Sequence, residues 1–334
     1  MLHTTTAKTA GLLICSLVLL AAAVASIAFG QTRIPLNVVI DALFHYDDHI
    51  TEHIIIQSSR LNRAVLAVVI GTNLACAGTM LQALTRNALA SPSLFGINAG
   101  ALFFIVAAFS FFSLTSLEQY IWVAFMGATV AGLLVYLLGY QQSIGFAPIQ
   151  VVLAGAAITA LFVAFTQGLL ILNRESLEGI LFWLGGSLSS RTMAMIIPFL
   201  PLFALAWIVT MIMTRQMNLM LLNDEIAKGL GQRIIVVRLV LGTLVIVLAG
   251  GSVALAGMIG FVGLIIPHLA RMLFGRDHRW VLPAAAMFGA ILLLLADTLS
   301  RFVVPPQELP VGVMTAFLGT PVFIAIARRR SPVL

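Results

Sequence analysis

Charged residues are scarce in this 334-residue chain: they make up 9% of it, whereas hydrophobic residues make up 61%. An average soluble domain carries roughly 25% charged residues, so this composition excludes a water-soluble globular protein. A transmembrane helix needs about 20 mostly apolar residues, and such runs fill most of the chain. Because lipid offers the backbone no hydrogen-bond partners, these runs must be helical. No segment has the alternation of an outer-membrane barrel strand.

Cysteine and lysine are also rare. Cys15 and Cys76 lie inside apolar runs, where we expect them to pack as small hydrophobic residues without a disulfide or a metal. The only lysines are Lys8 and Lys228, and neither follows the glycine pattern of a phosphate-binding loop. The net charge of +6 has no basic patch with interleaved aromatics, so we expect no nucleic-acid partner. We find no catalytic site and no metal-ligand pair within the membrane, and we expect neither enzyme activity nor a cofactor bound by this chain.

Ten apolar runs suggest ten transmembrane helices, of which the eighth is short and contains Pro267. They lie near residues 9–30, 64–84, 93–113, 119–139, 148–172, 193–213, 236–257, 259–273, 281–299 and 309–327. A cytoplasmic N-terminus puts 12 of the 18 basic residues inside and nine of the 12 acidic residues outside. The positive-inside rule therefore favours one polytopic domain over 1–334 with both termini in the cytoplasm. The alternative for 9–30 is a cleaved signal peptide, but this run exceeds the usual apolar core of about 7–15 residues.

Two halves of the chain share short patterns. Residues 71–78 resemble residues 250–257, and 126–128 resemble 288–290. At the same offset of 162 as the second pair, Pro148 matches Pro310. Spans two to five therefore look like a copy of spans seven to ten. Because the copies start five spans apart, they are inverted, as in many transporters. The competing explanation is that small residues recur in helices that pack closely.

The longest cytoplasmic loop lies between spans six and seven and has a helical pattern of its own. Leu222, Ile226 and Leu230 share one face, and Asp224 and Glu225 precede Lys228 by one turn. This pattern is compatible both with a short helix that fits a socket on a partner protein and with a helix that lies among lipid headgroups.

Several motifs, in order along the chain, resemble those of the FecCD family of permeases, which import ferric siderophores, ferric citrate, haem and cobalamin. The motifs occupy residues 60–63, 77–82, 86–96, 225–231, 260–271, 295–297 and 308–312. They extend from residue 60 to near the C-terminus. The stretches 91–98 and 182–186 resemble the ferric citrate type in particular.

The resemblance implies an all-α fold and an ABC importer of the inner, cytoplasmic membrane. It implies a second permease subunit, identical or paralogous, and two ATP-binding subunits that hold ATP and magnesium. It also implies a periplasmic or lipid-anchored substrate-binding protein. Outward arginines would dock that protein, the loop between spans six and seven would couple to the ATPases, and the loop after span two would form part of the cytoplasmic gate. The implied docking residues are Arg60, Arg63 and Arg301; the coupling residues, within 218–231, are Asn218, Leu222, Asp224, Glu225, Ala227, Lys228, Gly229 and Gly231; the gate residues are Asn87 and Leu89.

The chain departs from the family pattern at two positions. Asn62 stands where the family usually has proline between the two docking arginines, and Ala88 stands where proline usually follows the gate asparagine. Alanine restores a backbone N–H and frees φ, so we expect a less rigid gate loop.

Two other features carry competing interpretations. His49 and His53 are four residues apart and could share a helical face as metal ligands, although no further ligand is evident. Asp297 lies near the end of an apolar run, where a carboxylate could relay protons in an ion-coupled secondary transporter. Arg301, one turn later, offers it an ion pair instead. A channel or scaffold is the third class, but no filter motif supports it.

Overall fold

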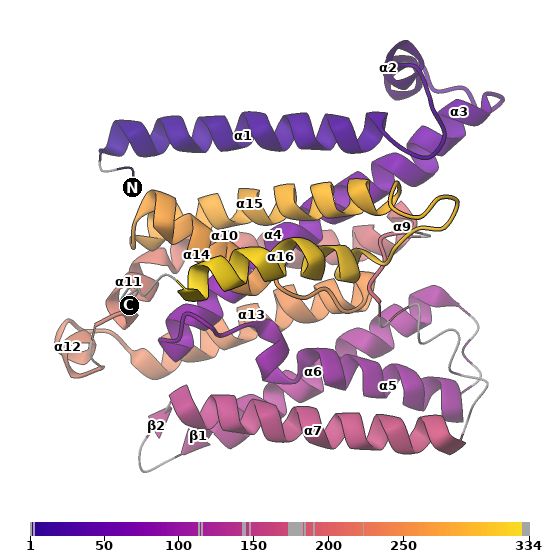
Figure 1. Cartoon of the computed structure of the whole chain (residues 1–334). Helices are drawn as coiled ribbons and strands as arrows, with labels where there is room; N and C mark the ends of the chain where they lie inside the picture. The colour runs from indigo at the N-terminus through magenta and orange to yellow at the C-terminus, as the bar shows by residue number, and fades with distance from the viewer. Residues whose placement is uncertain are drawn as a thin grey trace.

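The computed structural model describes residues 2, 4–112, 114, 116–141, 145–146, 148–172, 183, 185–189, 191–222 and 224–328. These residues form an all-α bundle (Figure 1), apart from a pair of two-residue antiparallel strands, β1 (Tyr140–Gln141) and β2 (Gly145–Phe146). Seven helical segments are long and apolar enough to cross a membrane. The segments are Thr5–Ala28, Thr51–Thr85, Leu117–Gly139, Ile149–Leu172, Met193–Ile212, Ile234–Ala256 and His278–Ser300. Three shorter apolar helices lie among them, at Ile97–Phe111, Val262–Phe274 and Val311–Ala325.

The first half of the chain contains helices α1 to α7. The elements are α1 (Thr5–Ala28), α2 (Leu36–Phe44), α3 (Thr51–Ile54), the π-helix η1 (Ile55–Leu61), α4 (Asn62–Thr85), the 3₁₀ turn η2 (Pro92–Phe95), α5 (Ile97–Phe111), α6 (Leu117–Gly139) and α7 (Pro148–Leu172). The short helix α2 was not predicted from the sequence. The predicted run at 64–84 falls within α4, which continues without a break from α3 and η1.

The second half contains helices α9 to α16. The elements are α9 (Met193–Ile196), the 3₁₀ turn η4 (Ile197–Phe199), α10 (Leu200–Ile212), α11 (Thr214–Met220), α12 (Asp224–Gly229), α13 (Ile234–Ala256), α14 (Val262–Phe274), α15 (His278–Ser300) and α16 (Val311–Arg328). The predicted eighth run at 259–273 begins its helix only at Val262, because Gly257 and Phe261 adopt positive φ angles that a helix does not allow.

Helix α4 lies at the centre of the bundle, and α1 lies at its edge. Small residues allow α4 to approach its neighbours closely. A Cβ atom added at Gly71 would lie 2.3 Å from the carbonyl oxygen of Gly289 in α15, and one added at Gly78 would lie 2.0 Å from that of Gly263 in α14. These glycines are therefore required by backbone contact, as is common where helices pack inside a membrane.

The two halves make corresponding contacts. Helix α4 packs along α15, and α13 packs along α6; α5 contacts α6 and α7, and α14 contacts α15 and α16. Gly71 faces Gly289 and Ala290, while Gly250, its counterpart in the sequence match, faces Ala128. Segments that match in sequence thus make equivalent contacts: α4 packs against α15 as its counterpart α13 packs against α6.

The two ends of the bundle carry different elements (Figure 1). The N-terminus, the C-terminal end of α16, the β1–β2 pair, α11 and α12 lie at one end, which we call the α12 end. Helices α2, α3 and α9 and the loop between α15 and α16 lie at the other, which we call the α2 end. The sequence-based topology places the same two groups of segments on opposite sides of the membrane.

Candidate functional sites at the two ends of the bundle

At the α2 end, the three predicted docking arginines come together. Arg60 lies in η1, Arg63 in the first turn of α4 and Arg301 directly after α15, and all three line a cavity of about 140 Å³ together with Glu308. The π-helical turn before α4 is one of the features that often accompany functional positions. The relative exposed areas of Arg60, Arg63 and Arg301 are only 4%, 6% and 2%. All three arginines are therefore buried within this chain.

Two of these arginines cap the C-terminal end of α1. Arg60 Nη1 donates to the carbonyl oxygens of Ile27 (3.0 Å) and Ala28 (2.7 Å). Arg301 Nη1 donates to the carbonyl oxygens of Ser26 (2.8 Å) and Phe29 (3.0 Å). The last carbonyls of a helix have no partner within the helix, so these guanidinium groups satisfy them and fix α1 to the bundle.

Asp297 is the centre of an ion-pair network. Its fully buried carboxylate accepts from Arg63 Nε (3.1 Å) and Nη2 (2.8 Å) and from Arg301 Nη2. Arg63 Nη1 also donates to both carboxylate oxygens of Glu308, at 2.9 and 2.7 Å. The predicted Asp297–Arg301 pair is present, and the second partner, Arg63, was missed because it lies 234 residues away. Both oxygens of this carboxylate are thus occupied by arginine donors.

At the α12 end, the segment 218–231 presents an exposed apolar face. Leu222, Ile226 and Leu230 are exposed, as are Glu225 and Lys228, while Ala227 is buried against the bundle. Space for a side chain is open at Gly229 and Gly231, and Gly231 has a φ of +82° that favours glycine. Ile226 lies in α12, and Leu222 and Leu230 lie just before and just after it; exposed large apolar residues grouped in this way indicate a contact surface, with protein or with lipid.

The polar residues of the same segment face inward. Asp224 accepts from Arg86 Nη2 at the end of α4 (2.5 Å) and from Arg238 Nη2 in α13 (2.9 Å). The carboxylate of Asp224 therefore pairs with arginines of two other helices and not with Lys228 of its own helix. Partial burial raises the pKa of Asp224, but Arg238 and Arg86 outweigh this and hold it below its usual range. One carboxylate thus joins α12 to both α4 and α13.

Asn218 makes a second attachment. Its Nδ2 donates to Asp277 Oδ1 (2.7 Å), and its Oδ1 accepts from the backbone N–H of His278 (2.9 Å). Asp277 also caps α15 by accepting from the backbone N–H of Arg279. Partial burial raises the pKa of Asp277, but these hydrogen bonds outweigh it, and the pKa lies below its usual value. The segment is thus fixed to the turn between α14 and α15.

The predicted gate residues follow directly on Arg86, which ends α4 in the left-handed conformation. The side-chain oxygen of Asn87 accepts from the backbone N–H of Leu89 (2.9 Å), and its carbonyl accepts from that of Ala90 (3.1 Å). Gln82 Nε2 also donates to the carbonyl of Ala90 (3.3 Å). The loop is therefore fixed by hydrogen bonds from Asn87 and Gln82, and Leu89 is exposed.

The two candidate metal ligands do not share a helical face. Helix α3 begins at Thr51, so His49 precedes it. His53 is buried and its Nδ1 accepts from the backbone N–H of Asp47 (3.2 Å), whereas His49 is exposed beside Asp48. The arrangement in which both histidines would act as ligands from one helical face is therefore absent at these two residues. Within the described residues, the group that could hold a metal is the exposed set Asp47, Asp48 and His49.

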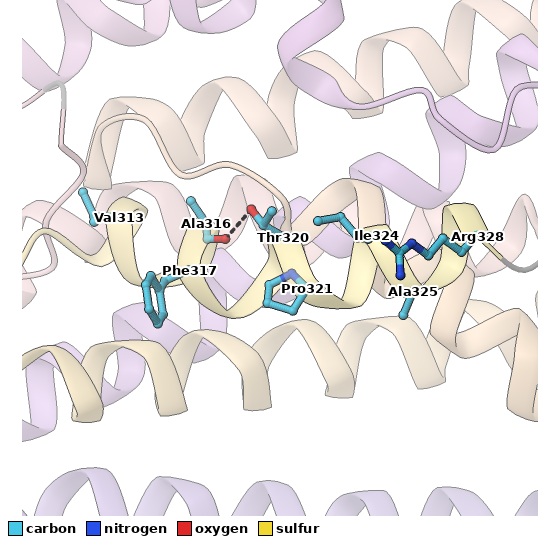
Figure 2. A pocket seen from close by; sticks show the side chains of 8 residues that line it. All are labelled: Val313, Ala316, Phe317, Thr320, Pro321, Ile324, Ala325 and Arg328. Atoms are coloured by element: carbon cyan, nitrogen blue, oxygen red, sulfur yellow. Dashed lines mark hydrogen bonds between the residues drawn. The ribbon is translucent and has the colours of Figure 1, made fainter.

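Helix α16 has an uncovered apolar face (Figure 2). It borders an open cavity of about 970 Å³. The lining residues are Val313, Ala316, Phe317, Thr320, Pro321, Ile324, Ala325 and Arg328. The hydroxyl of Thr320 donates to the carbonyl of Ala316 (2.7 Å), so this polar group is satisfied within the helix. The face is apolar along almost its whole length, and it ends at Arg328.

The fold is that of a multi-pass helical membrane protein with an exposed, anchored segment at one end. The model of the FecCD transport family matches residues 18–329, and the chain belongs to this family. It is 45% identical over 318 residues to the "Probable siderophore transport system permease protein YfiZ" of Bacillus subtilis, with 95% of each chain covered. It is 38% identical to the Fe(3+)-citrate import system permease protein YfmD of Bacillus subtilis, covering 91% of this chain and 90% of that one.

A solved structure supports the same fold. The chain superimposes on an inward-facing metal-chelate type ABC transporter with a TM-score of 0.83 and 29% sequence identity, covering 96% of this chain and 99% of that one. The similarity to the FecCD family inferred from the sequence is thereby confirmed. The roles of individual docking, coupling and gate residues stay predictions, because these comparisons do not test them.

Proposed function

We propose that the chain is the membrane-spanning permease subunit of an ABC importer that moves an iron chelate, such as a ferric siderophore or ferric citrate, across the inner membrane. The observation that carries this proposal is the match of almost the whole chain to a metal-chelate ABC transporter. The named relatives, which are permeases of siderophore and ferric citrate systems, support the class of substrate. ATP and magnesium would bind in separate subunits.

The proposal includes ten spans with both termini in the cytoplasm. The seven long helical segments and three shorter apolar helices would each provide one span, in one domain. The α12 end would then be cytoplasmic and the α2 end would face the periplasm. Helices α4–α7 and α13–α16 would form the inverted repeat, which the matching contacts of Gly71 and Gly250 support.

The exposed face of 218–231 would contact the ATPase. When the ATPases close, they would push on Leu222, Ile226 and Leu230, and the bonds of Asp224 would pass this displacement to α4 and α13. Alternating access is then a shift between two arrangements of packed helices, which the partner biases. The gate loop 87–89 would move with α4, because it directly follows Arg86, the residue that ends α4.

The face of α16 would pack against the second permease subunit, which would cover Phe317 and close the cavity beside it. The arginine cluster would lie beneath the docked binding protein. Arg60 and Arg301 donate to carbonyls of α1, and Arg63 donates to Asp297 and Glu308. An acidic side chain of the partner would therefore reach the cluster most readily at Arg63, by replacing Glu308, which is only partly buried.

The proposal is tested by assembly with the ATPase subunit. Ile226→Glu should abolish co-purification of the ATPase, because it places a charge in the contact surface. Ile40→Glu, a similarly exposed residue in α2 at the opposite end, is the matched control and should leave assembly intact. Equal recovery of the ATPase with both variants would contradict the assignment of this surface.

A further inference from the structure

A small cavity lies at the α12 end, beside the C-terminal part of α4 and the turn between α14 and α15. Its volume is about 170 Å³. The lining residues are Gln82, Ala83, Arg86, Leu221, Arg271, Arg276 and His278. Three of these seven residues are arginines and none is acidic. The cavity therefore has a strongly cationic wall.

Arg271 is the unusual member of this wall, because it is buried without a carboxylate. It is 8% exposed, and its Nη2 donates to Gln82 Oε1. Its Nε has no hydrogen-bond partner, and no ion pair includes Arg271 among the residues that the structure describes. A buried charge without a counter-charge is costly, so an anion in the cavity would relieve a real electrostatic deficit.

The nearest carboxylates are already in use. Asp224 is bound by Arg86 and Arg238, and Asp277 accepts from Asn218 and from the backbone of Arg279. Neither carboxylate forms an ion pair with Arg271 among the described residues, and the residues that line the cavity carry three guanidinium groups and no carboxylate.

We propose that this cavity binds a phosphate-type oxyanion, either free phosphate or the phosphate of an anionic lipid headgroup. Its volume is that of about five or six water molecules at roughly 30 Å³ each, which is enough for a tetrahedral oxyanion with some water. Guanidinium groups match the geometry of phosphate oxygens and can donate two hydrogen bonds at once.

The side chain of Gln82 positions Arg271 at the cavity. Gln82 accepts from Arg271 while its Nε2 donates to the carbonyls of Leu264 (3.1 Å) and Ala90 (3.3 Å). The amide therefore holds Arg271 in place and links it to the loop after α4. An anion bound to Arg271 would lie beside that loop. This inference goes beyond the proposed import function and does not depend on it.

The test uses the full chain in a maltoside detergent and phosphate-free buffer. Binding of radiolabelled inorganic phosphate is measured at constant ionic strength, and retention of phosphatidylglycerol relative to phosphatidylcholine is measured by native mass spectrometry. The variants are Arg276→Gln, which is exposed and should fold, and Arg271→Lys, which keeps the charge and loses the fork. Arg279→Gln, an equally exposed neighbour that does not line the cavity, is the control.

We expect saturable binding of one of the two probes to the wild type, weakened about tenfold or more by both variants. Arg276→Gln removes a charge-assisted contact, and Arg271→Lys removes the paired hydrogen bonds that a guanidinium can donate. Arg279→Gln should bind as the wild type does. Phosphate binding would identify a free anion as the ligand, and selective retention of phosphatidylglycerol would identify a lipid. Absence of saturable binding of both probes, or equal weakening by Arg279→Gln, would overturn the proposal.

Discussion

The bonds of Asp224 give the sharpest prediction for coupling. Asp224→Asn keeps the size of the side chain and removes the charge that Arg86 and Arg238 share. The side chain is 38% exposed, so each contact is worth no more than about 0.5–1 kcal/mol after solvent screening. Loss of both contacts costs ~1–2 kcal/mol, which shifts the attachment of α12 by a factor of about 5–30.

The consequence is measured as ATP hydrolysed per chelate imported, in proteoliposomes that contain the permease, the ATPase and the binding protein. Asp224→Asn should keep ATP hydrolysis and lose import, so that the ratio rises several-fold. Glu118→Gln is the matched control, because Glu118 is an exposed carboxylate in the first turn of α6, outside the coupling segment, and the substitution removes the same charge. An unchanged ratio in Asp224→Asn, or an equal rise in Glu118→Gln, would refute the reasoning.

The remaining predictions concern packing, charge and assembly. Gly78→Ala should destabilise the chain by about 1–3 kcal/mol, because the new Cβ meets the backbone of Gly263, whereas Gly168→Ala meets no atom within 4 Å and should not lower the thermal unfolding midpoint. The pKa of Asp224 is lowered in the folded protein. Its ion pairs with Arg86 and Arg238 are therefore fully present above the ordinary carboxyl pKa of about 3.9 and are lost as the pH falls through the lower folded value. Import should show no loss from this group between pH 5 and pH 8. Phe317→Gln should weaken cross-linking between permease subunits about tenfold, while Leu17→Gln on α1, which is also exposed, should not. Glu308→Gln frees Arg63 Nη1 from a competing carboxylate and should tighten docking of the binding protein, most clearly at low salt; weaker docking would contradict the contact at Arg63.

The helices could be predicted from the sequence because long apolar runs are a local signal. The run at 236–257 corresponds to α13 and the run at 281–299 to α15. The start of α14 could not be read in this way, because apolar residues continue through 259–261 while Phe261 takes a positive φ. Helix α2 was missed because it is short and lies outside the long runs.

The sites could be predicted only in part. The family motifs indicate Arg60, Arg63 and Arg301, and the structure brings these residues together. The amino-acid pattern does not show that Asp297 joins Arg63 to Arg301, because ion pairs across more than 200 residues leave no local signal. In the coupling segment, Leu222, Ile226 and Leu230 are all exposed, but only Ile226 lies in α12, so the predicted helix is shorter in the structure. The helical pattern also paired Asp224 with a neighbour in the same helix, whereas the tertiary structure offers it two buried or half-buried arginines.

The central claim is that this chain moves its substrate only when an ATPase acts on the segment 218–231. Its most direct test is uptake of a radiolabelled ferric chelate into proteoliposomes, with the permease alone and with its ATPase and binding protein. We predict uptake only in the complete system with ATP supplied on the side of the ATPase, and none with a proton or sodium gradient alone. Gradient-driven uptake by the permease alone would contradict the account.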